Sequence, residues 1–191
     1  MEGGSTEKKI KGTTIVDVVK TIRSLDGLPW DEHLSDEAKQ LVSQRILASQ
    51  WYDFGPALLC IRAMYKLVGK EDPELARQWA KANSRRMVEE TYRGFVGARD
   101  LDASIMRFST MARSNLVRGL EFEMEKIGDR HYRVTFMDDD PGTEVIYYFI
   151  QGWLEMLVEI SGVSNYSVRF LEKHWEGSKR TAIDIEWEKE G

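Results

Sequence analysis

The fold is decided by residues 143–187, which read TEVIYYFIQGWLEMLVEISGVSNYSVRFLEKHWEGSKRTAIDIEW. Residues 143–160 are apolar at most positions and predict one long helix. Residues 166–170 then alternate apolar and polar side chains, and residues 181–187 repeat that alternation, so both predict strands. The short basic and acidic segment 172–178 predicts the turn between them.

The same reasoning extends toward the N-terminus. Residues 120–136 alternate apolar and charged side chains around Gly128-Asp129 and predict a β-hairpin with one solvated face. Helical spacing, caps and helix-breaking residues predict five helices before this hairpin. The first has Ile15 to Leu25 on its apolar side, and the next three begin at Ser35, Asp53 and Pro73. The fifth is expected over residues 102–118.

These elements predict an α+β fold. An N-terminal helical set is expected to pack on a C-terminal four-stranded antiparallel sheet crossed by one long helix. Residues 1–11 are polar and rich in glycine and lysine, so they predict a disordered tail. Residues 12–191 are expected to form a single domain.

Composition excludes several classes of protein. The net charge of −5 offers no global field for nucleic acid, so no nucleic-acid partner is expected. Residues 1–11 do not resemble a signal peptide. The longest apolar run, residues 145–160, includes Gln151, Glu155 and Glu159 and is too short to span a bilayer. We therefore expect a cytoplasmic protein without a membrane span.

The order of helices, hairpin, long helix and two closing strands resembles the superfamily of haem-NO-binding sensor domains and 4-vinyl reductase-type small-molecule-binding domains. The strongest local similarities are Trp51-Tyr52-Asp53-Phe54 and the closing residues 177–187. This resemblance implies a ligand cavity between the helical set and the sheet. It also implies a histidine iron ligand on the helix before the hairpin in haem-binding members, and cysteines near the last turn in reductase-like members.

Neither chemical signature matches this chain. The helix expected over 102–118 has no histidine, and its Met106 and Met111 are weak ligands at best. The turn 172–178 has no cysteine, and His174 beside Glu172 or Glu176 is better interpreted as a solvated turn. We therefore expect no cofactor, with haem disfavoured, and no metal site.

Other candidate sites are interpreted more simply as structure. Cys60, the only cysteine, lies on an apolar helix face and predicts a buried, inert thiol. Asp138 to Asp140 predict a solvated loop. One basic group predicts either a solvated helix face or an anion- or partner-binding patch: Lys81, Arg85, Arg86, Arg93 and Arg99. No nucleophile or paired acid–base arrangement is visible, so an enzyme ranks last.

The aromatic content suggests the function. We expect a non-catalytic sensor domain that holds a small apolar or aromatic ligand and signals through a partner protein or a homo-oligomer, most simply a homodimer. The candidate ligand-binding residues are Arg62, Tyr65, Arg107, Phe108, Tyr148 and Trp153. The alternative is a structural or dimerisation module whose pocket is filled by its own side chains.

Overall fold

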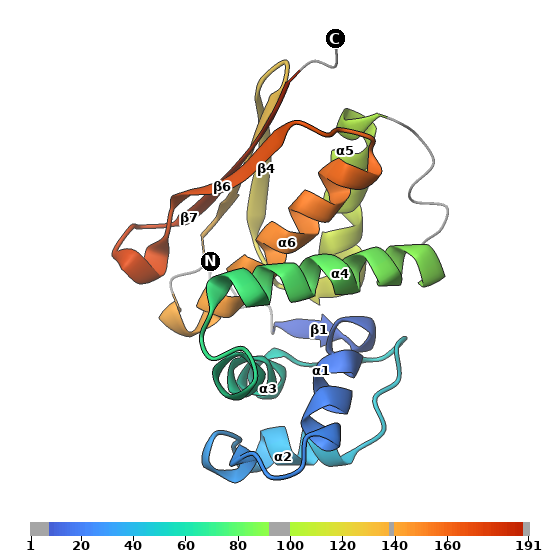
Figure 1. Cartoon of the computed structure of the whole chain (residues 1–191), viewed down its shortest axis with the longest axis vertical. Helices are drawn as coiled ribbons and strands as arrows, with labels where there is room; N and C mark the ends of the chain where they lie inside the picture. Colours follow the sequence, from blue (N-terminus) through green and yellow to red (C-terminus); the bar gives the residue numbers. More distant parts are fainter. Residues whose placement is uncertain (1–7, 92–99, 138–139, 189–191) are drawn as a thin grey trace, which may run out of the picture. The chain divides into compact units, whose positions relative to one another are not determined.

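The computed structural model of the chain describes residues 8–91, 100–137 and 140–188 (Figure 1). The chain divides into two compact units. Unit 1 comprises Met1–Asp72 and Met111–Leu120, and unit 2 comprises Pro73–Thr110 and Glu121–Gly191. The fold is α+β, as the sequence predicted, and the C-terminal sheet is four-stranded and antiparallel.

Unit 1 contains a small sheet that the sequence did not predict. Its strands are β1 (Lys9–Lys11), β2 (Trp51–Asp53) and β3 (Val117–Arg118), in the antiparallel order β2-β1-β3. The expected disordered tail over residues 1–11 is therefore wrong for Lys9–Lys11, while residues 1–7 lie outside the described part. Asp53 precedes the third helix as expected, but its side chain pairs with Lys9 instead of capping that helix.

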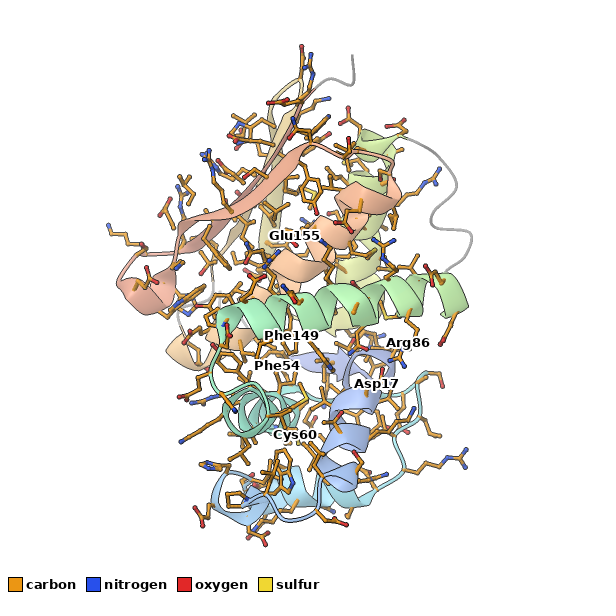
Figure 2. All side chains as sticks on the ribbon, in the orientation of Figure 1. Asp17, Phe54, Cys60, Arg86, Phe149 and Glu155 are labelled. Atoms are coloured by element: carbon orange, nitrogen blue, oxygen red, sulfur yellow. The ribbon has the colours of Figure 1, made fainter. Side chains whose placement is uncertain are left out.

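The helices of unit 1 enclose an aliphatic core. They are α1 (Gly12–Ser24), η1 (Trp30–Glu32), α2 (Asp36–Ser43), α3 (Phe54–Leu67) and the π-helix η3 (Ala112–Leu116). Ser35 caps α2 as predicted, since its hydroxyl accepts a hydrogen bond from the Ala38 amide. Cys60 lies on α3 with its sulfur 3.8 Å from the Ala38 carbonyl oxygen of α2 (Figure 2). Cys60 is buried as predicted, and burial raises the pKa of its thiol to about 12, which disfavours the reactive thiolate.

Unit 2 is built on the predicted four-stranded sheet. Its strands are β4 (Phe122–Gly128), β5 (His131–Phe136), β6 (Tyr166–Glu172) and β7 (Thr181–Trp187), in the order β4-β5-β7-β6. Alternation decides the two faces. Tyr132, Val134, Ile183 and Ile185 are buried on one face, while the charged residues between them lie on the other. This alternation is the pattern that identified the strands in the sequence.

The helices of unit 2 are α4 (Pro73–Thr91), α5 (Leu101–Met111), η4 (Pro141–Thr143), α6 (Glu144–Ile160) and η5 (His174–Glu176). The helix expected over 102–118 is shorter than predicted, because the chain changes to the π-helix η3 after Met111. Gly177 ends η5 with a φ of 97°, as expected of a turn glycine. None of the described helices is both long enough and apolar enough to cross a bilayer.

Helices α4 and α6 approach closely at Gly152 of α6. A Cβ atom at this position would lie 2.2 Å from the Arg77 carbonyl oxygen and 3.0 Å from the Lys81 amide nitrogen. Both atoms are backbone atoms of α4, so a side chain at residue 152 would force the two helices apart. Glycine therefore sets the distance at which α4 crosses α6 (Figure 1).

Candidate functional site

The predicted ligand-binding residues of α3 lie at its C-terminal part. Arg62 is exposed, and Tyr65 is half-buried. The Tyr65 hydroxyl donates a hydrogen bond of 2.9 Å to the Glu71 carbonyl oxygen. Glu71 and its neighbour Lys70 both have positive φ angles, so Tyr65 supports an unusual turn after the helix.

Two more of the predicted residues contact each other in unit 2. Phe108 of α5 is buried, and its ring meets the half-buried Trp153 of α6 edge to face, with ring centroids 6.3 Å apart. Arg107, the neighbour of Phe108 on α5, is exposed. The structure thus brings Phe108 and Trp153 together and leaves an arginine beside them on the surface of α5.

Tyr148 belongs to a cluster of rings around the N-terminal half of α6. We call this set the aromatic cluster: Phe136, Tyr147, Tyr148, Phe170, His174 and Trp175. Trp175 stacks on Tyr147 at 5.6 Å and meets Tyr148 edge to face at the same centroid distance. The Tyr148 hydroxyl lies 3.0 Å from Glu144 Oε1, one helical turn earlier, and donates to it. Aromatic rings of the chain itself therefore pack closely around this part of α6.

His174 lies inside the aromatic cluster, and the solvated turn predicted there is wrong for this residue. Its side chain is buried, its Nε2 lies 2.8 Å from the Asp140 carbonyl oxygen, and its Nδ1 lies 2.7 Å from Thr181 Oγ1. A carbonyl only accepts hydrogen bonds, so Nε2 carries a proton and donates it. In the neutral ring Nδ1 then accepts from the Thr181 hydroxyl. His174 therefore ties η5 to the loop before α6 and to β7.

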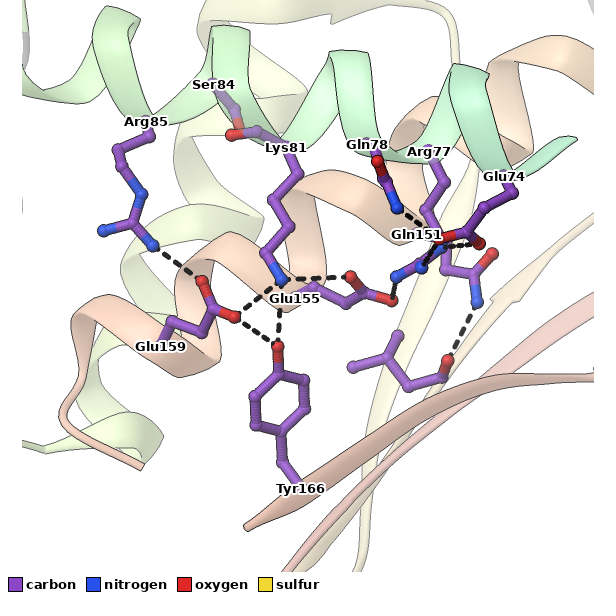
Figure 3. Close-up of polar contacts among 11 residues, drawn as sticks. Glu74, Arg77, Gln78, Lys81, Ser84, Arg85, Gln151, Glu155, Glu159 and Tyr166 are labelled. Atoms are coloured by element: carbon purple, nitrogen blue, oxygen red, sulfur yellow. Dashed lines mark hydrogen bonds and ion pairs between the residues drawn. The ribbon is translucent and has the colours of Figure 1, made fainter. Parts of the chain in front are cut away.

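The C-terminal half of α6 carries a set of charges facing α4 (Figure 3). We call it the α4–α6 charge network: Glu74, Arg77, Lys81, Arg85, Glu155, Glu159 and Tyr166. Glu155 pairs with Arg77, and its Oε2 lies 3.4 Å from Lys81 Nζ. Glu159 accepts hydrogen bonds from Lys81 at 2.6 Å and from Arg85 at 2.7 Å. Lys81 and Arg85 were predicted to form either a solvated helix face or an anion- or partner-binding patch. In the structure they instead pair with Glu155 and Glu159 of α6.

Lys81, Glu159 and Tyr166 form the part of the network that most resembles a chemical site. Tyr166 Oη lies 2.6 Å from Glu159 Oε1 and 3.1 Å from Lys81 Nζ. Burial raises the pKa of Tyr166, and its hydrogen bond to Glu159 raises that pKa further. Burial alone would lower the pKa of Lys81, but the hydrogen bonds to Glu159 and Tyr166 outweigh it and raise that pKa. A lysine or tyrosine that acts as a base near neutral pH needs a lowered pKa, so these raised pKa values favour a structural role for the group.

A second polar group lies on the charged face of the unit 2 sheet. His131 Nε2 is 3.0 Å from Asp184 Oδ2 and 3.8 Å from Glu186 Oε1, a spacing that three metal ligands can adopt. Each carboxylate also forms an ion pair with an arginine. Arg133 Nε lies 2.7 Å from Asp184 Oδ1, and Arg169 Nη2 lies 3.1 Å from Glu186 Oε2. The hydrogen bond from Arg133 lowers the pKa of Asp184. The arginines already balance the two negative charges, which disfavours a cation here.

Neither polar group was predicted from the sequence, although one signal for the charge network was present. On α4, Arg77, Lys81 and Arg85 repeat every four residues, and on α6 Glu155 and Glu159 have the same spacing. Residues four apart share a helix face. An acidic pair on an otherwise apolar helix could therefore have been matched to the basic row on α4. Arg86 hydrogen-bonds Asn83, whereas Arg93 and Arg99 lie outside the described residues.

Comparisons with known proteins identify solved structures that have a similar fold. No family model matches the chain, and no curated protein matches it. Solved structures do match. A structure from a study of haem distortion in the H-NOX family is 16% identical with a TM-score of 0.63, covering 94% of this chain and 96% of that one. An unliganded iron(II) H-NOX mutant from K. algicida is 9% identical with a TM-score of 0.61, covering 94% and 97%.

A third match is an oxygen-binding H-NOX domain related to soluble guanylate cyclases, 16% identical with a TM-score of 0.60 over 94% of this chain and 96% of that one. These matches overturn the expectation that the protein has no cofactor and that haem in particular is disfavoured. That expectation is wrong because solved proteins with this fold are described by their haem and their oxygen ligand.

The described residues do not match a histidine-ligated iron on α5. That helix contains no histidine, and both ring nitrogens of His174 already contact protein oxygens. His131 likewise contacts Asp184 through Nε2. Any iron ligand in this chain would have to differ from the histidine that the family resemblance places on that helix. At these levels of identity, the comparisons show that the chain has the H-NOX fold.

Proposed function

We propose that this protein is a non-catalytic sensor domain with the H-NOX fold. It binds a small apolar or aromatic ligand, haem included, and transmits the bound state to a partner protein or to a second copy of itself in the cytoplasm. The observation that carries this proposal is the similarity to H-NOX structures over 94% of the chain. The raised pKa values of Lys81 and Tyr166 disfavour these two residues as bases near neutral pH.

The six candidate residues remain our proposed ligand contacts, and they differ in what they offer. Phe108 and Trp153 present an edge-to-face ring pair with Trp153 half-exposed, and Arg107 is an exposed cation beside them. Arg62 and Tyr65 belong to α3 of unit 1. Tyr148 lies in the aromatic cluster, and its hydroxyl already donates to Glu144. Within unit 2, an apolar or aromatic ligand with an anionic group suits Phe108, Trp153 and Arg107.

A structural module without a ligand is the second candidate, and the aromatic cluster favours it. Tyr147 is fully buried between Phe136, His174 and Trp175, so α6 is packed there by side chains of the chain itself. A domain that fills its own interior in this way needs no ligand to complete its core. It would act through its surface alone, as a dimerisation or docking unit.

Native mass spectrometry and absorbance spectroscopy decide between the two. The purified protein is measured as isolated and again after incubation with haemin. We expect either a co-purified organic mass or a Soret band, and we expect Phe108→Ala/Trp153→Ala to reduce it. The control is Ile127→Ala, an exposed position on β4 of the same unit. A protein that stays ligand-free in both states would reject the sensor proposal and support the structural module.

A further inference from the structure

The outer face of the small sheet in unit 1 concentrates positive charge around one indole ring. Cross-strand partners in an antiparallel sheet share a face. Lys9 pairs in register with Asp53 and with Arg118, and Lys11 pairs with Trp51, so these side chains share one face. We call it the basic face: Lys9, Lys11, Trp51, Asp53 and Arg118. The intervening residues Ile10, Tyr52 and Val117 are buried on the opposite face.

Two of these cations converge on Trp51. Lys11 Nζ lies 4.6 Å from the indole centroid, and the Arg118 guanidinium carbon lies 4.1 Å from it. Cation–π contacts hold each charge near the ring, but two like charges at one ring repel each other. Lys9 has Asp53 as its ion-pair partner. Among the described residues, no carboxylate forms an ion pair with Lys11 or Arg118, so this pair lacks a counter-charge.

From this arrangement we propose that the basic face binds an extended, acidic segment of a partner protein. An anion between Lys11 and Arg118 relieves their repulsion. Lys9 and Lys11 lie two residues apart on β1, which spaces them by roughly 6.6–6.8 Å along the strand. Alternate residues of an extended peptide have the same spacing. A carboxylate of such a peptide therefore pairs with Lys11 and Arg118, which lies on the adjacent edge strand. A second carboxylate two residues away lies near Lys9, which it shares with Asp53.

A protein segment suits this face better than a single-stranded nucleic acid. Base binding on such a surface depends on aromatic rings that are free to stack. The Trp51 ring instead contacts two cations already. The chain as a whole also carries a net charge of −5, which opposes a long polyanion but tolerates a short segment with a few carboxylates. The proposal deepens the sensor function above, since it gives the chemistry of the signalling partner.

The test uses the full chain and a fluorescein-labelled peptide of alternating glutamate and serine, followed by fluorescence anisotropy at low and high salt. We expect saturable binding that weakens as salt rises. Lys11→Glu/Arg118→Glu should weaken binding by about tenfold or more, because two attractions become repulsions. The matched control is Lys66→Glu/Lys179→Glu, which makes the same change in net charge at exposed positions outside the basic face.

Lys11→Gln/Arg118→Gln, checked for folding by circular dichroism, keeps the test valid if the charge-reversed variant is unstable. It should also weaken binding, by a smaller factor. Unchanged binding by the folded patch variants, or an equal loss in the control, overturns the proposal. So does tighter binding of a thymidine oligonucleotide than of the peptide. Ligand retention by the Lys11→Gln/Arg118→Gln variant separates this failure from a failure of the sensor proposal, which is read by absorbance and mass.

Discussion

The two halves of α6 differ in what they add to a buried apolar face: the first half packs against aromatic rings, and the second half forms ion pairs with α4. Residues 145–150 are buried, and Tyr147 and Tyr148 pack among rings from β5, β6 and η5. Residues 152–160 cross α4, and there Glu155 is only 5% exposed and pairs with Arg77. The first half thus depends on shape and buried apolar area. The second half also buries Leu154, Leu157 and Val158, and it adds partnered charge on the side that faces α4.

The difference explains how one helix is held in a single position. Apolar packing supplies much free energy but specifies orientation loosely, because apolar contacts have no direction. A buried carboxylate is costly unless its partners meet it in the right geometry. Glu155 meets Arg77 and Lys81 only when α6 has one register against α4, and Gly152 allows the close approach that this register requires. We infer that the apolar half stabilises α6 and the charged half positions it.

The largest loss of stability is expected from a substitution that removes a buried ring from the N-terminal half of α6. Tyr147→Ala removes a fully buried ring from the aromatic cluster and should lower the free energy of unfolding by about 3–5 kcal/mol. Urea denaturation measures this loss. Met106→Ala, at a position 60% exposed on α5, serves as the control and should change it by about 0.5 kcal/mol or less. A loss at Tyr147 no larger than the control would show that the cluster is not a packed core.

A smaller effect should follow from disturbing the helix crossing. Gly152→Ala places a methyl group against the α4 backbone and should cost about 1–3 kcal/mol, even though alanine favours a helix. Gly55→Ala in α3 is the matched control. No atom outside its own helix and chain neighbours lies within 4 Å of a Cβ there, so alanine should stabilise by up to about 1 kcal/mol. Thermal unfolding compares the two, and equal signs would refute the close crossing.

The smallest effect should come from the charged half, and it should depend on pH. Burial alone would raise the pKa of Glu159, but hydrogen bonds from Lys81 and Tyr166 outweigh it and lower that pKa below its ordinary 4.5. A lowered folded-state pKa stabilises the fold above pH 4.5, and this contribution disappears as the pH falls through the folded-state value. Glu159→Gln should therefore cost about 1 kcal/mol or less at pH 7 and progressively less in acid.

Urea denaturation of the Glu159→Gln variant and the parent protein between pH 7 and pH 3 measures this difference. The same substitution at Glu123, exposed on β4, controls for general charge effects. A stability difference at residue 159 that stays constant over this range would contradict the role assigned to its ion pairs.

Local sequence pattern was enough for the larger elements. The apolar run of α6, the alternation in β6 and β7, the Ser35 cap and the turn at Gly177 were each predicted and found. Strands β1, β2 and β3 were not, because two or three residues show no periodicity. Their pairing joins positions far apart in the chain, such as Lys9 with Asp53 and with Arg118.

The candidate site divides in the same way. The sequence identified Phe108 and Trp153 as aromatic candidates, and the structure brings them into contact. It did not reveal that Lys81 and Arg85 would meet Glu159, because those partners lie more than seventy residues away. It also assigned His174 to a solvated turn, whereas tertiary packing buries that ring against Tyr147.

The sequence by itself determined the longer helices, the four strands of the unit 2 sheet and the apolar faces of these elements, since all of them follow from periodicity within a few residues. Only the tertiary structure decided what those faces meet. It packed the rings of η5 against the N-terminal half of α6 and paired Glu155 with Arg77 of α4. It also brought Lys11 and Arg118 to one indole. These outcomes depend on distances between segments remote in the chain, which local propensity does not encode.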